Sequence, residues 1–309
     1  MSLSQEEQEN VYRLLYSGQL DSIQLGLKLA KTLKLDIQSF QAVVKDLYKR
    51  IYPDKDVSKI PLVRQINGLY QLKRMEMKDL NSPKILLLIM HLTQLTRLEI
   101  SESQVTSIPP QINQLTQLEV LNISFNKSLT SLPDEIGNLT QLYKLEFWHN
   151  NLITLPEQIG NLKQVALLNA TDNQMEEFPI GITRMSGLEV LALLQNKIRV
   201  LPPEIGDLTN VSSLYLAYNC LTTLPAEIGN LPILLELEVG RNNLISIPAE
   251  IGNLTKLMSL GLSYNHLTSL PVEIRNLINL KELSLKGNPM REETVAEIRS
   301  WLPGCKVSF

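Results

Sequence analysis

The sequence predicts an α/β solenoid, in which short repeats stack along one axis. The main observation is a motif, L-x-x-L-x-L-x-x-N-x-L-x-x-L-P-x-x-I-x-x-L, which returns every 23 residues along most of the 309-residue chain. The second is composition. Hydrophobic residues make up 44% of the chain but aromatic residues only 5%, so the core is aliphatic and suited to uniform layers. Both observations favour one elongated repeat domain over two compact domains.

The copies of the motif are regular enough to align by eye. Successive copies begin 23 residues apart, except where the segment SFNKSLTSLP adds one residue before Leu142. A degenerate copy begins at Leu72 and has Met75 and Met77 at the strand positions. The complete copies begin at Leu95, Leu118, Leu142, Val165, Leu188, Val211, Leu234, Leu257 and Leu280.

The phrases LPDEIGNLTQL, LPPEIGDLTNV and IPAEIGNLTKL resemble the 23-residue class of leucine-rich repeats found in bacterial proteins and in Ras-linked scaffolds of animals and plants. The resemblance covers residues 60–309, about ten repeats. It implies a curved solenoid with a parallel sheet on the concave face and short helical or irregular turns on the convex face. It does not imply a particular partner, because this family binds many unrelated molecules.

The two ends of a solenoid need covers, since each end exposes a layer of core. Residues 1–59 are predicted to form a helical N-terminal cap or a small helical subdomain, with helices over 4–16, 21–35 and 36–51. A docking module for a second partner is the alternative for this region. At the other end, 289–309 is predicted as a C-terminal cap containing a short amphipathic helix.

An asparagine follows each predicted strand, where the chain turns inward and leaves backbone groups without partners in the sheet. Its side-chain amide can bond such groups in its own coil and in the next. We therefore interpret the series as a structural ladder and not as a row of ligand-binding amides. The predicted ladder is Asn126, Asn150, Asn173, Asn196, Asn219, Asn242, Asn265 and Asn288.

The residues between the core leucines alternate outward, onto the concave face, and equivalent residues of adjacent coils lie about 4.8 Å apart. Phe147 points inward, whereas the neighbouring Trp148 is expected to stand outward on an otherwise polar sheet. Apolar and aromatic residues gather in the middle coils with charged residues on both sides, which is typical of protein-binding surfaces. The candidate partner-binding residues are Phe125, Trp148, His149, Leu167, Val190, Leu194, Tyr215, Tyr218, Arg241 and Tyr264.

A structural alternative stays open for part of this set. The position before each ladder asparagine tolerates aromatic rings that only lean on the strand edge, which would account for Phe125, Tyr218 and Tyr264. Trp148, Leu194 and Tyr215 favour binding more strongly, because the repeat does not require an apolar group at their positions.

Several classes of function are disfavoured. A net charge of -3 gives no basic surface for nucleic acid, and no run of eighteen apolar residues predicts a membrane span. The two cysteines, Cys220 and Cys305, are more than three coils apart and are predicted to be free thiols. Cysteine and histidine spacing offers no metal site, and no cofactor is expected. His149 lies near Glu146 and Asp172, but no nucleophile accompanies them, so catalysis is not predicted.

The sequence therefore predicts a non-catalytic protein–protein interaction scaffold that binds a protein partner on its concave face and is itself a monomer. The alternative is a secreted or surface protein for recognition or adhesion, directed at a host or at glycans. Free thiols and the absence of a signal peptide favour the cytoplasm, whereas a signal peptide removed from the given sequence would favour secretion.

Overall fold

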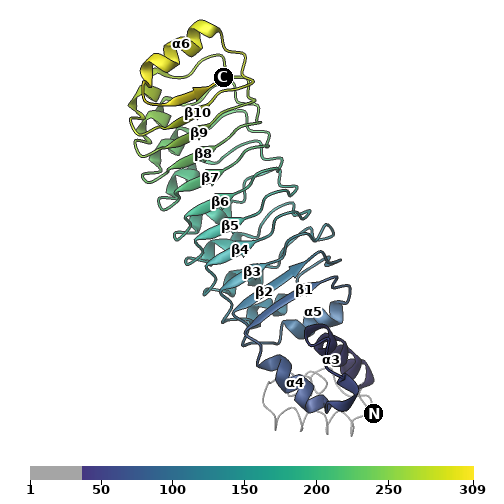
Figure 1. Cartoon of the computed structure of the whole chain (residues 1–309). Helices are drawn as coiled ribbons and strands as arrows, with labels where there is room; N and C mark the ends of the chain where they lie inside the picture. Colours follow the sequence, from purple (N-terminus) through teal and green to yellow (C-terminus); the bar gives the residue numbers. More distant parts are fainter. Residues whose placement is uncertain (1–36) are drawn as a thin grey trace.

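The computed structural model describes residues 37–309, which form one elongated, curved solenoid (Figure 1). The helices predicted over 4–16 and 21–35 lie outside the described residues. From residue 72 onward the coils follow one another in chain order, so that each coil contacts mainly its two neighbours. The fold is a curved α/β solenoid with one parallel sheet, as the sequence predicts.

An eleven-stranded parallel sheet lines the concave side, with its strands in chain order from β1 to β11. From β2 to β9 each strand has a leucine that pairs with the equivalent leucine of the next strand, as in Leu98, Leu121 and Leu145. This register follows from the constant repeat length, because each coil returns the chain to the same place. The strands are β1 (Arg74–Lys78), β2 (Arg97–Ser101), β3 (Val120–Asn122), β4 (Lys144–Glu146), β5 (Leu167–Asn169), β6 (Val190–Ala192), β7 (Ser213–Tyr215), β8 (Glu236–Glu238), β9 (Ser259–Gly261), β10 (Glu282–Ser284) and β11 (Lys306–Ser308).

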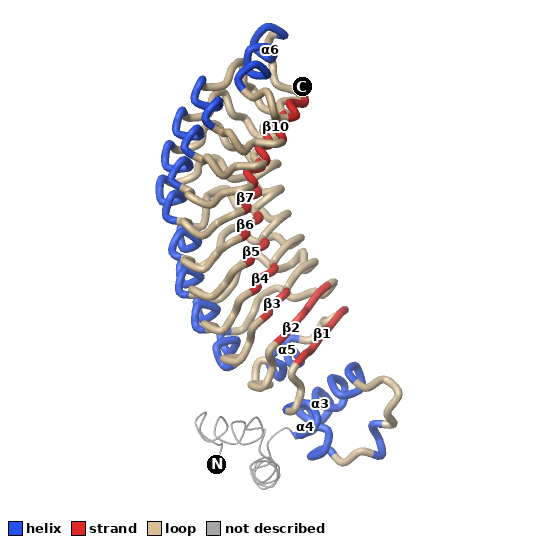
Figure 2. The backbone as a smooth tube through the Cα atoms, turned by 60° about the vertical axis from the view of Figure 1, so that its left-hand side comes forward, coloured by secondary structure: helices blue, strands red, loops and turns tan. Residues whose placement is uncertain are grey.

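Short 3₁₀ turns cover the opposite, convex side (Figure 2). From η2 to η9 a proline precedes each turn, with φ between −64° and −75°. The proline ring fixes φ near these values and so directs the chain into the turn. The turns are η2 (Pro110–Gln114), η3 (Asp134–Asn138), η4 (Glu157–Asn161), η5 (Ile180–Arg184), η6 (Pro203–Asp207), η7 (Ala226–Asn230), η8 (Ala249–Asn253) and η9 (Val272–Asn276).

Helices pack at the N-terminal end of the sheet. The segment predicted over 36–51 is α3 (Ile37–Ile51), which packs against α4 (Leu62–Tyr70) and α5 (Pro83–Ile89). A short turn, η1 (Val57–Lys59), joins α3 to α4. Val44, Leu47 and Tyr48 of α3 are buried and belong to the same continuous core as the coils. These described helices therefore extend the core and cover its first layer.

The C-terminal end closes with α6 (Glu292–Trp301) and β11. Val295 and Ile298 of α6 are buried against the last coil. β11 continues the sheet by pairing with β10, where Leu283 lies opposite Val307. The sequence predicts helix α6 of this cap but not strand β11, since residues 306–308 lie beyond the last copy of the motif.

The asparagines at the strand ends bond the backbone of two coils. In Asn173, Nδ2 donates to the carbonyl oxygens of Phe147 (2.9 Å) and Ala170 (3.0 Å), while Oδ1 accepts from the backbone N–H of Leu152 (2.9 Å). Ser103 holds the equivalent place one coil before Asn126, and its Oγ accepts from the N–H of Leu80 (2.8 Å). Buried backbone groups of successive coils are thereby satisfied.

Candidate protein-interaction surface

The residue before each ladder position adopts a left-handed backbone, with φ between 49° and 60° from Glu102 to Tyr264. Here the strand ends and the chain turns inward toward the ladder. Non-glycine residues rarely adopt this conformation, and its return in every coil holds these residues at a regular spacing. We call this series the rim row: Glu102, Phe125, His149, Asp172, Gln195, Tyr218, Arg241 and Tyr264.

An apolar patch lies on the concave face of the two middle coils and consists of Leu167, Val190, Ala192 and Leu194. Leu167 pairs with Val190 across β5 and β6, and Ala192 pairs with Tyr215 across β6 and β7. Leu167, Val190 and Leu194 are half-buried. Each of the three side chains therefore presents part of its surface to solvent.

Trp148 lies on the outward side of the sheet and is half-buried beside Phe125. The two rings lie 4.2 Å apart, edge to face, and the ring of Phe125 also lies 4.8 Å from that of His149. We call these three residues the aromatic cluster. The spacing between coils explains it, because Phe125 reaches Trp148 and His149 from the coil before. Phe147, which lies in the sequence between the end of β4 and Trp148, is fully buried, as predicted.

Arg241 stacks between two tyrosines further along the rim row. Its guanidinium carbon lies 4.1 Å from the ring centre of Tyr264 and 5.0 Å from that of Tyr218. Tyr218 is 49% exposed and Tyr264 is 40% exposed. We call these residues the Tyr–Arg–Tyr stack; it combines a fixed positive charge with two accessible aromatic rings.

Tyr215, the remaining candidate, is half-buried beside the apolar patch, and its hydroxyl donates a hydrogen bond to the Glu236 carboxylate. This hydrogen bond, together with burial, raises the pKa of Tyr215 above its usual value. The hydroxyl of Tyr215 is therefore already hydrogen-bonded within the protein, and the ring of Tyr215 is left to contact a partner.

Charged residues flank the first coils and are largely paired with one another. Lys78 bonds Glu102 at 2.9 Å, and Arg97 bonds Glu99 at 2.5 Å. These exposed or half-exposed pairs contribute little stability, but they neutralise one another at the N-terminal end of the concave face.

The structure does not join His149, Glu146 and Asp172 into an acid–base relay. Asp172 contacts Nδ1 of His149 and also lies 3.4 Å from Nζ of Lys127, whereas Glu146 pairs with Lys144 at 3.1 Å. Within residues 37–309, no group of three His, Cys, Asp or Glu side chains is arranged to hold a metal ion. Nor does that part of the chain contain a helix long and apolar enough to cross a membrane. Both cysteines are free.

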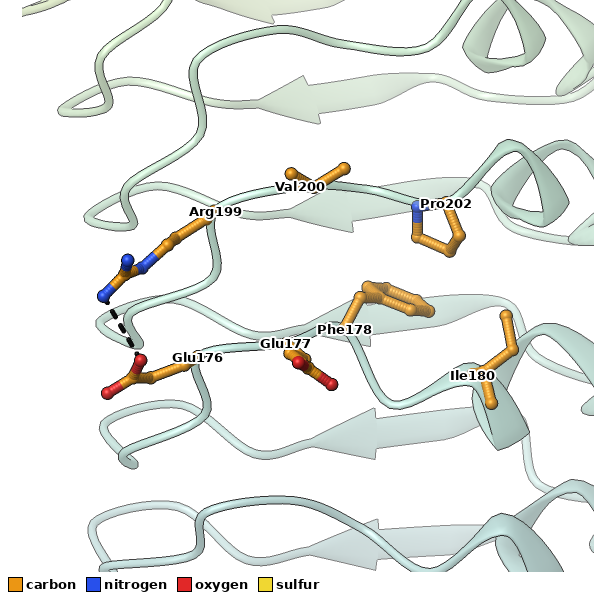
Figure 3. Close-up of a pocket in the computed structure, with 7 residues that line it drawn as sticks. All are labelled: Glu176, Glu177, Phe178, Ile180, Arg199, Val200 and Pro202. Carbon is orange, nitrogen blue, oxygen red and sulfur yellow. Dashed lines mark hydrogen bonds and ion pairs between the residues drawn. The ribbon is translucent and has the colours of Figure 1, made fainter.

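A surface pocket of about 530 Å³ lies on the flank between the coils that begin at Val165 and Leu188. Figure 3 shows Phe178 between the backbones of these two coils, and Arg199 paired with Glu176 at 3.2 Å. The sequence did not lead us to predict this pocket. A feature of the sequence that marks its place is the segment FPIGITRM (178–185), which departs from LPxEIGNL and has Thr183 where most coils have glycine. The neighbouring turns η5 and η6 also pack less closely than other adjacent pairs from η2 to η9.

Comparisons with known proteins agree with the repeat fold. The family described as Leucine-rich repeat region matches residues 204–301, and the family Leucine Rich Repeat matches residues 117–139. A leucine-rich repeat protein of Leptospira interrogans is 31% identical, with a TM-score of 0.64 over 80% of this chain and 68% of that chain. No curated protein matches the sequence.

Two further solved structures show the range of the fold. The plant peptide hormone receptor RGFR1 in complex with RGF2 is 31% identical, with a TM-score of 0.68. The match covers 79% of this chain but only 40% of the receptor chain. An internalin from Listeria monocytogenes is 18% identical with a TM-score of 0.53, covers 87% of this chain and 88% of its own, and shows the fold alone.

Proposed function

Because this chain belongs to the leucine-rich repeat family, whose fold commonly serves as a protein-interaction module, we propose that it is a non-catalytic scaffold that binds a protein partner across its concave face. The binding surface consists of the apolar patch, the aromatic cluster on one side and the Tyr–Arg–Tyr stack on the other. We also propose that the chain acts as a monomer, which light scattering after gel filtration would test.

The observation that carries this proposal is the departure of the middle coils from the polar pattern around them. The buried leucines and the asparagines fix the solenoid, so the outward residues of the strands are not needed for the fold. Leu167, Val190 and Leu194 nevertheless form an apolar centre, whereas Glu102 and Glu282 lie toward the two ends of the face. Protein-binding surfaces typically have an apolar centre surrounded by polar and charged residues.

The test compares two substitutions, each of which introduces a negative charge. Leu194→Glu places a carboxylate in the apolar patch, and Ile278→Glu places one between η9 and β10, where Ile278 is 81% exposed. A partner is first captured from native extract, and its affinity is measured with each purified variant. We expect Leu194→Glu to weaken binding by roughly thirtyfold or more, as for the loss of an interface anchor, and Ile278→Glu to leave it unchanged. The proposal fails if only Ile278→Glu weakens binding.

Recognition or adhesion outside the cell is the second candidate function. The likeness to part of a plant peptide hormone receptor, whose structure was solved in complex with RGF2, supports it. Fractionation of the native source, followed by immunodetection of the chain, separates the two candidates: recovery from the cytoplasm favours the scaffold, and recovery from the medium or the cell surface favours recognition outside the cell.

A further inference from the structure

Among the residues of the concave face, the Tyr–Arg–Tyr stack is the group whose chemistry indicates most specifically what it binds. We infer that this stack receives an aspartate or glutamate side chain from an extended acidic segment of the partner protein. The inference rests on the proposed function, since it assigns one contact within the same surface.

The repeat itself builds the stack. The rim-row residues Tyr218, Arg241 and Tyr264 have φ values of 58°, 52° and 56°, so their side chains leave the backbone in the same way. Each is tied to the following coil by its own backbone N–H, as Arg241 is to the carbonyl oxygen of Ser263 at 2.7 Å. The coil spacing of about 4.8 Å is within the roughly 6 Å over which a guanidinium is attracted to the face of an aromatic ring. The backbone therefore brings Arg241 within reach of both rings, and the rings hold its guanidinium before any ligand arrives.

The charge of Arg241 is not neutralised within residues 37–309. Arg97, on the same face, is paired with Glu99 at 2.5 Å, but Arg241 has no carboxylate partner in the described part of the chain. Glu238, three residues earlier, instead accepts a hydrogen bond from the backbone N–H of Gly240 at 2.9 Å. The two rings lie against the guanidinium, and its N–H groups, which have no carboxylate partner among the described residues, are left to bind a ligand.

A carboxylate is the group that fits this arrangement. A guanidinium bonds a carboxylate through two parallel N–H···O contacts, and rings stacked on its faces restrict the approach to its edge. Lys286, in the coil that carries β10, is exposed and adds a second positive charge near Tyr264. Glu238 in β8 and Glu282 in β10 are acidic, so the inference depends on the unpaired guanidinium of Arg241 and not on a net positive surface.

The spacing of the coils also predicts the shape of the ligand. Arg241 and Leu194 belong to coils two steps apart, which is about 10 Å at the usual spacing between strands. An extended peptide covers that distance in about three residues, at about 3.3 Å for each. A bound segment should therefore carry an acidic side chain at Arg241 and an apolar side chain about three residues away, over the apolar patch.

The experiment uses a random peptide library displayed on phage and selected on the immobilised full chain. We expect enriched peptides to share an aspartate or glutamate about three residues from a large apolar residue. Arg241→Gln should weaken the binding of a selected synthetic peptide about tenfold or more, because a charged hydrogen-bonded contact is lost. Glutamine suits this backbone, since Gln195 adopts φ 53° at the equivalent position of another coil.

The matched control is Arg97→Gln, which removes an arginine from the same face and should change the affinity less than twofold. A charge exchange separates direct contact from a structural effect. Arg241→Glu should lose the selected peptide, and a peptide with lysine in place of its acidic residue should bind this variant better than the original peptide does. Restoration of this kind is not expected if Arg241 only supports the fold.

The outcomes also separate this inference from the proposed function. Peptides that depend on Leu194 but bind Arg241→Gln unchanged would overturn the acidic contact and leave concave-face binding intact. Peptides that bind both Leu194→Glu and Arg241→Gln as well as wild type would overturn both proposals. Selection of no peptide, or of peptides without a shared acidic residue, would overturn the acidic contact.

Discussion

At the scale of single residues, the ladder asparagines do more for stability than their small, polar side chains suggest. In Asn196, Nδ2 donates to the carbonyl oxygens of Ala170 and Leu193, at 3.1 and 3.2 Å. Its Oδ1 accepts from the N–H of Met175 at 3.1 Å. Asn196→Ala would leave these buried backbone groups unpaired, so we expect the free energy of unfolding to fall by about 1–3 kcal/mol. Urea denaturation followed by circular dichroism measures this change.

The control is Asn243→Ala, since Asn243 is exposed and immediately follows the buried ladder residue Asn242. We expect the control to stay within about 0.5 kcal/mol of wild type, as surface substitutions usually do. Affinity for the partner should be the same in both variants. A stable Asn196→Ala protein that no longer binds would instead place this asparagine in the binding site.

How far the sequence predicts a residue's position depends on whether the repeat determines it. Phe147 occupies a core position of the motif and is fully buried, as alternation along the strand predicts. Trp148 lies on the outward side, but alternation does not reveal that Phe125, from the preceding coil, covers part of its ring at 4.2 Å. Such contacts depend on side-chain conformations in two coils. For the same reason, the stacking of Arg241 between tyrosines could not be predicted from one repeat.

At the scale of elements, most copies of the motif have glycine after the isoleucine, at a place where adjacent convex turns lie close together. A Cβ atom added at Gly229 in η7 would lie 2.3 Å from the carbonyl oxygen of Glu250 in η8. One of the two turns must then shift. We expect Gly229→Ala to lower the free energy of unfolding by about 1–3 kcal/mol through this overpacking, measured by urea denaturation.

Gly304→Ala is the control, because a Cβ atom there meets nothing within 4 Å. It should leave the unfolding transition unchanged. Equal stability of Gly229→Ala and Gly304→Ala would mean that the convex turns can separate at little cost in free energy.

The sequence predicts the elements inside the repeats better than those outside them. The strands β2 to β10 follow from the period, and β1 from the degenerate copy with Met75 and Met77. By contrast, β11 comprises only three residues beyond the last copy, and it forms because the edge of β10 offers unpaired backbone groups. That edge exists only in the assembled solenoid, so no local pattern indicates the strand.

At the scale of the whole molecule, the stacking of coils makes stability a nearly local property. Each coil packs mainly on its two neighbours, and the core is continuous from α3 to α6. Damage at one end should therefore loosen the nearest coils first and leave the distant ones intact. The C-terminal cap allows this to be tested, because α6 covers the last coil.

Ile298→Asp supplies the test, because Ile298 is fully buried in α6 and a carboxylate there has no water around it. We expect α6 to detach, which exposes the layer around Leu283 and speeds hydrogen exchange in β10 and β11. Exchange in β3 and β4, many coils away, should stay at the wild-type rate. Mass spectrometry of peptic fragments after hydrogen–deuterium exchange resolves the two regions.

The control is Ala296→Asp, at an exposed position on the same helix, which should alter the exchange rate in neither region. Equal acceleration in β3 and β10 would show that the solenoid unfolds as one cooperative unit.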